Sequence, residues 1–221
     1  MPDGPVVPQW SRGTAARQAH VSLPAGTVEE EHGRDGFAGP ASHLYRLHPP
    51  TGWTSVEGPL RPHAIDAGRL AGSGDDADAA DLPVALLENG QVRISFWCRP
   101  SGTPDWFFRD ADGDLLYFVH RGEGTLETEY GPLPLRPGDY LLVPRGTTHR
   151  VAAEAPVQLL VVEALEGRVG LPDRGLLGRH ALFDPAVIEV PEPEPVEADG
   201  EFEVRVLRAD AVTRIRYPFH P

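Results

Sequence analysis

Histidine is the side chain in this sequence best suited to bind a transition metal, and it occurs nine times. Five of these residues are scattered along the chain: His43, His48, His120, His149 and His220. A protein site for a transition metal usually needs three or more ligands, because a single neutral imidazole loses its metal to solvent. Isolated histidines are more often surface or hydrogen-bonded groups. We therefore expect His149 to be a satisfied core or rim residue rather than a metal ligand.

Carboxylates form the second candidate group, since Asp105, Asp110, Asp112 and Asp114 follow one another within a glycine-containing stretch. The string from Asp112 to Asp114, with Gly113 between them, suggests a calcium loop. A calcium loop of the helix–loop–helix type has twelve residues and a closing Glu, and neither follows here. The sequence therefore predicts a solvated turn at this point.

The composition excludes several classes of function. The chain of 221 residues has 33 acidic residues against 20 basic ones, all of which are Arg, for a net charge of −13. Because the chain has no Lys, it cannot use a lysine for Schiff-base catalysis or for a phosphate-binding loop. Its excess of acidic residues disfavours binding to nucleic acid. No run approaches the roughly 18 apolar residues of a membrane span.

The N-terminus and the cysteine content indicate where the protein works. Residues 1–15 lack the apolar segment of a secretory signal. The only cysteine, Cys98, excludes an internal disulfide, and we expect it to be a buried packing residue. These features predict a cytoplasmic protein.

Short apolar runs punctuated by 24 Gly and 24 Pro predict strands rather than helices. Val92, Ile94, Phe96 and Cys98 alternate with more polar neighbours, as in a half-buried strand. Further strands are expected at 115–120, 125–130, 140–144, 157–162 and 201–207. A short helix is expected only near 176–182. Five or more strands without intervening helices predict an all-β, antiparallel β-barrel.

The composition divides the chain into three parts. Residues 1–81 are expected to form an extended N-terminal arm that packs on the barrel and ends in a mobile loop at 66–81. Residues 82–166 are expected to be the barrel core. Residues 167–221 should contain an irregular segment, a stiff acidic and proline-spaced connector at 191–195, and a final strand.

The string from Gly138 to His149, GDYLLVPRGTTH, resembles the second motif of the cupin superfamily, whose fold is a jelly-roll barrel. The first cupin motif is matched only in its apolar framework, from Leu115 to Gly124. The residues that match the two motifs are Asp110, Gly122, Gly124, Gly138, Pro144, Gly146 and His149. The resemblance implies a cupin jelly-roll barrel with the extended N-terminal arm added to it.

This sequence departs from metal-binding cupins at the ligand positions. Aligning Gly122 with the family's glycine places Leu115 where the family has its Glu, and residues 108–111 where it has its His-x-His pair. Of a four-ligand set only His149 remains, with Asp110 the single other residue there that could bind a metal. We therefore expect no metal in this chain.

Several longer strings, in the same order along the chain, resemble homogentisate 1,2-dioxygenases over about residues 30–217. They are EHGRDGF at 31–37, YRLHPPTGW at 45–53, NGQVRI at 89–94, RDADGD at 109–114, TEYG at 128–131 and PRGTTHR at 144–150. These enzymes combine a metal-free N-terminal cupin with a C-terminal cupin that holds Fe(II) through two His and a Glu. The string TRIRYPF at 213–219 looks like the family's linker ahead of that second cupin.

The resemblance implies that this chain is the metal-free N-terminal half of an aromatic ring-cleaving dioxygenase of tyrosine and phenylalanine catabolism. The catalytic residues and the Fe(II) of the intact family have no counterpart here, and residues that contact a substrate are not assigned. The implied partners are further copies in a trimer-based homo-oligomer and a C-terminal cupin half, without nucleic acid or membrane. The alternative is a stand-alone metal-free cupin that binds a small molecule or acts as an isomerase or epimerase.

Overall fold

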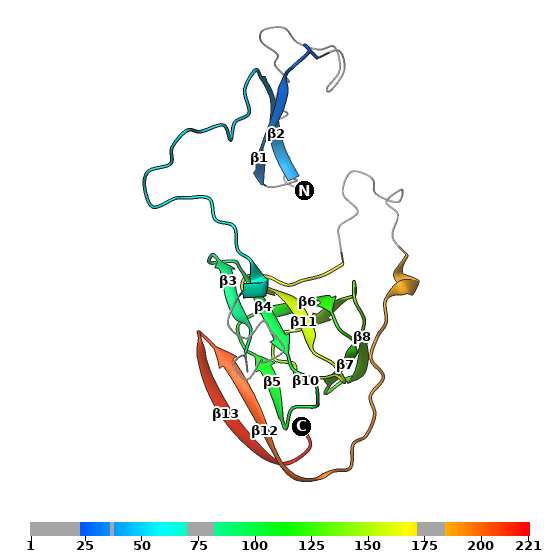
Figure 1. Cartoon of the computed structure of the whole chain (residues 1–221). Helices are drawn as coiled ribbons and strands as arrows, with labels where there is room; N and C mark the ends of the chain where they lie inside the picture. Colours follow the sequence, from blue (N-terminus) through cyan, green and yellow to red (C-terminus); the bar gives the residue numbers. More distant parts are fainter. Residues whose placement is uncertain (1–22, 36–37, 70–81, 172–183) are drawn as a thin grey trace. The chain divides into compact units, whose positions relative to one another are not determined.

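The computed structural model describes residues 23–35, 38–69, 82–171 and 184–221, and strands dominate this part of the chain (Figure 1). No α-helix occurs there, and no helix in it is long and apolar enough to cross a membrane. The strands are β1 (Val28–Asp35), β2 (Ala38–Arg46), β3 (Val84–Glu88), β4 (Val92–Arg99), β5 (Trp106–Asp110), β6 (Asp114–Arg121), β7 (Gly124–Thr128), β8 (Gly131–Leu135), β9 (Tyr140–Val143), β10 (His149–Ala152), β11 (Val157–Ala164), β12 (Asp199–Arg208) and β13 (Ala211–Phe219). Two single 3₁₀ turns are η1 (Ala67–Arg69) and η3 (Pro185–Val187).

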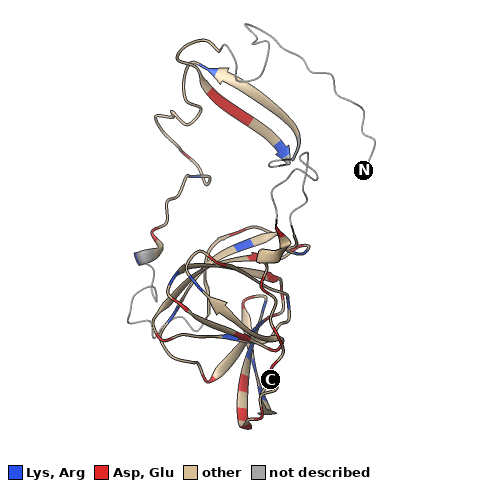
Figure 2. Cartoon of the chain, turned by 90° about the vertical axis from the view of Figure 1, so that its right-hand side faces the viewer, with Lys and Arg blue, Asp and Glu red and all other residues tan. Residues whose placement is uncertain are grey.

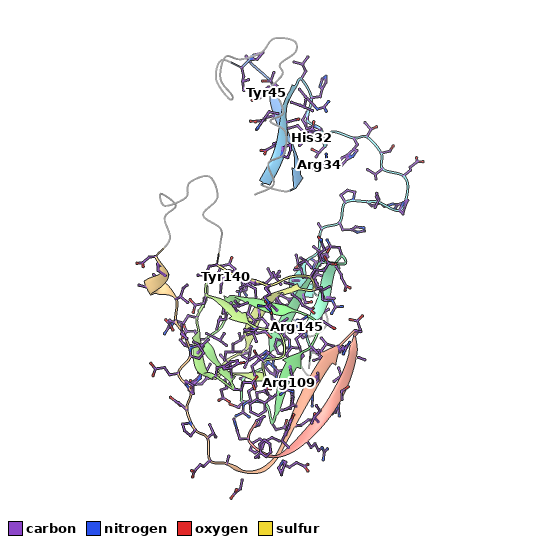
Figure 3. The ribbon with its side chains drawn as sticks, turned by 180° about the vertical axis from the view of Figure 1, so that it is seen from behind. His32, Arg34, Tyr45, Arg109, Tyr140 and Arg145 are labelled. Atoms are coloured by element: carbon purple, nitrogen blue, oxygen red, sulfur yellow. The ribbon has the colours of Figure 1, made fainter. Side chains whose placement is uncertain are left out.

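The chain separates into two compact units, Met1–His63 and Ala64–Pro221. In the first unit β1 and β2 form an antiparallel hairpin, on which His32, Arg34 and Tyr45 are labelled in Figure 3. The sequence analysis expected only an extended arm here, because neither strand has a long apolar run. Charged side chains hold the hairpin instead, for example the cross-strand pair of Glu30 with Arg46.

The second unit is a jelly roll of two sheets, as the sequence predicts. The six-stranded sheet has the order β13-β12-β5-β10-β7-β8, and the five-stranded sheet has the order β3-β4-β11-β6-β9. All pairings are antiparallel except that of β12 with β5, which is parallel. Acidic and basic residues occur in both units, and the run of glutamates in β1 is coloured red on the ribbon in Figure 2.

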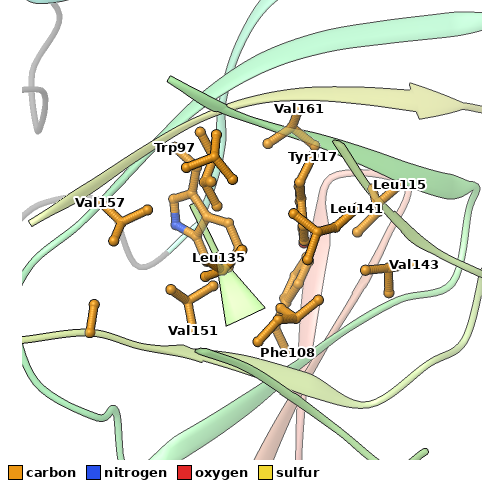
Figure 4. Close-up of a cluster of buried hydrophobic side chains, with 14 of the residues drawn as sticks. Trp97, Phe108, Leu115, Tyr117, Leu135, Leu141, Val143, Val151, Val157 and Val161 are labelled. Carbon is orange, nitrogen blue, oxygen red and sulfur yellow. The ribbon is translucent and has the colours of Figure 1, made fainter. Parts of the chain in front are cut away.

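The core lies between the two sheets and draws on both (Figure 4). Trp97 from β4, Tyr117 from β6 and Leu159 from β11 meet Phe108 from β5 and Leu126 from β7, and each is at most 1% exposed. The alternation in β4 is thus opposite to the one expected, since Trp97 faces the main core. Phe96 and Cys98 pack in a second, smaller cluster on the other face, with Cys98 buried as predicted.

The ends of the barrel differ from the sequence expectation in two ways. The strand predicted at 201–207 is β12, but it is not the final strand, because the chain turns back into β13 through Ala209 and Asp210, both with positive φ. Asp110 ends strand β5 and does not lie in a loop. The predicted helix at 176–182 and most of the predicted loop at 66–81 fall outside the described residues, and the packing of the N-terminal arm on the barrel stays a prediction.

The turn between β6 and β7 has the shape expected of the first cupin motif. Gly122 has a φ of 82°, and a Cβ at this position would lie 2.4 Å from the carbonyl oxygen of Pro156. Only glycine combines that backbone angle with that close approach. The tight turn returns the chain from the five-stranded sheet to the six-stranded one.

We predict that Leu159→Ala destabilises the protein by about 2–5 kcal/mol, because Leu159 is fully buried between the sheets and its truncation leaves a cavity. Leu87→Ala is the matched control, since Leu87 on β3 is 56% exposed, and it should change stability by less than about 0.5 kcal/mol. Urea unfolding followed by tryptophan fluorescence measures both. Equal effects of the two substitutions would contradict this account of the core.

Candidate functional site

The buried polar pair of the barrel is Tyr117 with His149. The Oη atom of Tyr117 lies 2.7 Å from Nε2 of His149, and Nδ1 of His149 lies 3.0 Å from the carbonyl oxygen of Thr147. A carbonyl oxygen only accepts, so Nδ1 carries the proton and Nε2 accepts the hydrogen bond from the tyrosine. Because β6 and β10 belong to different sheets, this hydrogen bond links the two sheets across the core.

Burial fixes the protonation of this pair. Removal from water lowers the pKa of His149 to about 4, since the charged imidazolium is disfavoured there. Burial also raises the pKa of Tyr117, and the nearby charges of Asp110 and Glu163 add to this effect. Both side chains are therefore neutral at pH 7, as their hydrogen bond requires.

Aromatic rings enclose the imidazole. Phe108 stands edge-on to His149 with 5.4 Å between ring centroids, and Trp97 stands edge-on to Phe108 at 5.5 Å. Tyr117 completes the group and is also packed against Trp97. Figure 4 shows Trp97, Phe108 and Tyr117 together in the middle of the core.

An Fe(II) centre of the kind implied by the resemblance does not fit these residues. Such a centre needs two imidazoles and a carboxylate with free lone pairs converging on one point. Here both nitrogens of His149 are hydrogen-bonded, and the positions compared with the family's ligands hold Phe108 and Leu115, two residues of the apolar core.

The remaining histidines named from the sequence do not join His149. His43 lies on the β1–β2 hairpin, 2.7 Å from Glu29, and His48 and His120 are exposed. His220 packs its ring against Phe107, with 5.1 Å between centroids. Each belongs to a different part of the described chain.

The aspartates expected to share one turn go to different places. Asp114 bridges two loops, since its carboxylate accepts hydrogen bonds from the backbone N–H groups of Arg145 and Val169. Asp105 is exposed, whereas Asp110 is buried and accepts from the N–H groups of the next turn. The expected solvated turn is therefore wrong for Asp110, because β5 carries it into the barrel wall.

Glu163 joins Asp110 and Asp112, although it was not among the residues predicted from the sequence. One carboxylate oxygen from each residue lies within 4.8 Å of the others. Burial, and the charge of Asp110, raise the pKa of Glu163 to about 7. The signal was present in β11, where Val157, Leu159 and Val161 point inward at every second position and Glu163 continues that series.

The motif glycines and Pro144 shape the loops around these side chains. Gly138 and Gly146 lie in the turns on either side of β9, both with positive φ, and Gly124 is the first residue of β7.

Arg109, labelled with Arg145 in Figure 3, donates a hydrogen bond from Nε to Oγ1 of Thr148 at 3.0 Å and so connects β5 to the start of β10.

The comparison with protein families decides the relationship. The model of the homogentisate 1,2-dioxygenase N-terminal family matches residues 81–207, more than half of the chain. The chain belongs to this family.

A curated protein is similar to most of the chain. A Saccharolobus solfataricus protein described as "Putative dioxygenase" is 27% identical over 210 residues, which cover 87% of this chain and 53% of the relative. The chain thus spans about half the length of the curated relative that it matches.

Two solved cupin structures are also similar to part of the chain. A cupin superfamily protein of Desulfitobacterium hafniense is 26% identical, with a TM-score of 0.34, and the match covers 38% of this chain and 77% of that one. A cupin protein of Bacteroides fragilis is 21% identical, with a TM-score of 0.35, and the match covers 43% and 86% of the two chains.

A second feature of this dioxygenase-like domain is an apolar groove of about 840 Å³. It lies where the edge strands β8 and β9 of the two sheets meet, and the segment after η3 forms one wall. The residues that line it include Leu126, Leu133, Leu142, Leu171, Ile188 and Val190. Tyr140, labelled in Figure 3, is exposed at its rim.

We predict that His149 makes the stability of this domain depend on pH. Its pKa is about 4 in the folded state, whereas a solvated imidazole has its ordinary value of 6.5, so the unfolded chain binds the proton more tightly. The contribution of His149 is complete above pH 6.5 and is lost as the pH falls towards 4. The protein should therefore lose about 2 kcal/mol of stability through His149 when the pH falls from 7.5 to 5.

The double variant Tyr117→Phe/His149→Leu provides the comparison, because it removes both polar groups and leaves neither without a partner. Urea unfolding at both pH values should show a smaller loss in the variant than in the wild type, by about 2 kcal/mol. An equal loss in the two proteins would mean that His149 is not held neutral by burial.

Proposed function

We propose that this chain acts as the metal-free N-terminal cupin of a homogentisate 1,2-dioxygenase-like enzyme. Its part is to provide the folded scaffold beside which a C-terminal cupin, on the same or on another chain, holds Fe(II) and opens the aromatic ring. The observation that carries the proposal is the match of residues 81–207 to the family's N-terminal domain.

The Tyr117–His149 pair supports the proposal that this domain is a scaffold and that the iron is bound elsewhere. It connects the strand of the first cupin motif to the end of the second motif through a hydrogen bond of 2.7 Å between two neutral groups. A scaffold domain benefits from such a pair, because a satisfied buried hydrogen bond fixes the packing without any need for a metal. The iron of the intact enzyme then has to be bound by the other half.

The first experiment loads the purified chain anaerobically with Fe(II) and then measures bound iron and oxygen uptake with homogentisate. We expect far less than one iron per chain and no uptake above the buffer rate, because His149 is the one imidazole buried in the described part of the barrel. When a cupin with two His and a Glu is encoded after this chain in its genome, co-expression of the two should restore oxygen uptake and produce a ring-opened product.

Two outcomes would count against the proposal. One is that the chain alone binds iron tightly and oxidises homogentisate, and that this oxidation disappears in His149→Ala. The other is a folded complex with the downstream cupin that binds iron but leaves homogentisate unchanged. Leu87→Ala, on the surface of β3, serves as the control for nonspecific loss of activity in either experiment.

A second candidate function is the binding of a small apolar molecule, and the groove between β8 and β9 favours it. Its volume of about 840 Å³ lies within the range of roughly 300–1,000 Å³ for ligand pockets. Aliphatic side chains predominate in its lining, with few polar groups such as Asp139 and Glu189. This surface suits an aromatic or aliphatic ligand with one or two polar substituents.

Titration with the fluorescent probe anilinonaphthalene sulfonate tests this candidate. We expect saturable binding that Leu142→Asp weakens by about tenfold or more, since a carboxylate in the groove must be desolvated. Leu87→Asp is the matched control, because it places the same charge on an exposed leucine away from the groove. Absence of saturable binding, or the same weakening in both variants, would exclude the groove as a ligand site.

A further inference from the structure

Three carboxylates converge where the chain crosses from one sheet to the other. Asp110 ends β5 in the six-stranded sheet, Asp112 lies in the turn that follows, and Glu163 comes from β11 in the five-stranded sheet. A small cavity of about 170 Å³ adjoins this corner and is lined by Asp110 and Glu163, with Arg93 and Ser95. The corner is separate from the groove between β8 and β9.

Beyond the proposed function, we infer that Asp110, Asp112 and Glu163 form a binding site for one calcium-sized divalent cation. The donor set consists of oxygen atoms, which hard cations prefer and which suit zinc or ferrous iron less well. The small cavity beside Asp110 and Glu163 offers room for water molecules that would complete the coordination shell. The site differs in place and in ligand type from the iron centre of the intact family.

The three oxygens lie close enough together to bind one calcium ion. One carboxylate oxygen of each residue lies within 4.8 Å of the other two. Two ligands on opposite sides of Ca²⁺ are about 4.6–5.2 Å apart, since each Ca–O distance is about 2.3–2.6 Å. Magnesium is the poorer fit, because it demands near-ideal octahedral geometry and keeps several of its water molecules.

An unsatisfied oxygen of Glu163 gives independent support. Glu163 is only 3% exposed, and its Oε1 atom has no hydrogen-bond partner among the described residues although it is buried. A buried carboxylate oxygen without a partner is costly, and native proteins rarely leave one in place. A cation bound between Glu163 and Asp110 would provide the missing partner.

The guanidinium of Arg93, which lies at this corner, does not neutralise it. Arg93 contacts three carboxylates. Its Nε atom lies 2.8 Å from Glu88 and its Nη2 atom lies 2.9 Å from Asp210, whereas its Nη1 atom lies 3.3 Å from Glu163. Glu163 therefore receives the longest of the three contacts. With Asp110 and Asp112 added, five carboxylates stand against this guanidinium, and a divalent cation reduces the excess of negative charge.

The backbone holds two of the carboxylates in place. Oδ1 of Asp110 accepts hydrogen bonds from the N–H groups of Asp112 at 2.8 Å and Gly113 at 3.1 Å. Oδ2 of Asp112 accepts from the N–H group of Ala209 at 2.6 Å, in the turn between β12 and β13. The C-terminal hairpin is thus attached to the corner, and we expect bound calcium to stabilise both together.

Isothermal titration calorimetry of the full chain with CaCl₂, after removal of metals with a chelator, tests the proposal. We expect one Ca²⁺ per chain with a Kd of about 10⁻⁵ to 10⁻³ M and weaker binding of Mg²⁺. Calcium at 100 times its Kd should shift the unfolding equilibrium about 100-fold towards the folded state. Terbium, added as a luminescent probe of similar size, should bind and be displaced by calcium.

Glu163→Gln should weaken calcium binding by about tenfold or more, because it removes a charged ligand and nearly preserves the side-chain volume. Glu194→Gln is the matched control, since Glu194 is exposed on the proline-spaced segment, and it should bind as the wild type does. Asp112→Asn is the second test variant if Glu163→Gln fails to fold. Lack of saturable calcium binding by the wild type, or unchanged binding in the folded test variants, would overturn the proposal.

Discussion

The hydrogen bond between Tyr117 and His149 is the interaction on which the centre of this barrel depends. It is a polar contact that joins the two sheets within the apolar core. If either side chain were removed, a buried polar atom of the other would be left without this hydrogen bond. Losing one partner costs about 1–3 kcal/mol for the group that remains, more than the net gain of a typical hydrogen bond. The packing of Phe108 and Trp97 around the imidazole follows from this requirement, because the rings exclude the water that would compete for it.

Because this hydrogen bond is buried in the apolar core, the neutral polar groups and the charged side chains lie in different parts of the barrel. The centre holds two neutral groups, whereas the carboxylates lie at the corner between β5, β6 and β11. The two regions are electrostatically linked, since the charges of Asp110 and Glu163 help to raise the pKa of Tyr117 and so keep it a hydrogen-bond donor. A cation at the corner would weaken this influence, and the tyrosine would still remain neutral because its burial is the larger cause.

Much of the fold could be predicted from the sequence, but only part of the candidate site. The β-prone apolar run of β11 and the Gly-Glu-Gly turn before β7 are local signals, and they indicated strands and a turn correctly, while the resemblance to cupins implied the jelly roll. The hairpin of β1 and β2 was missed because its strands are polar and paired through ions. Glu163 and Asp110 are 53 positions apart in the sequence, so no spacing rule connects them. Their meeting follows from the sheet order, which local patterns do not determine.

A core tied together by Tyr117 and His149 has a consequence for a two-cupin enzyme of the proposed kind. A barrel whose sheets are joined by a metal folds fully only when its ligands are deprotonated and the metal is supplied. Here the link is formed by side chains of the chain itself, so the domain reaches its final packing without iron. On the proposal above, loading of Fe(II) would concern the other cupin alone, and the iron-free enzyme would keep this half folded. The N-terminal half would then be a support whose packing does not depend on how much iron its partner holds.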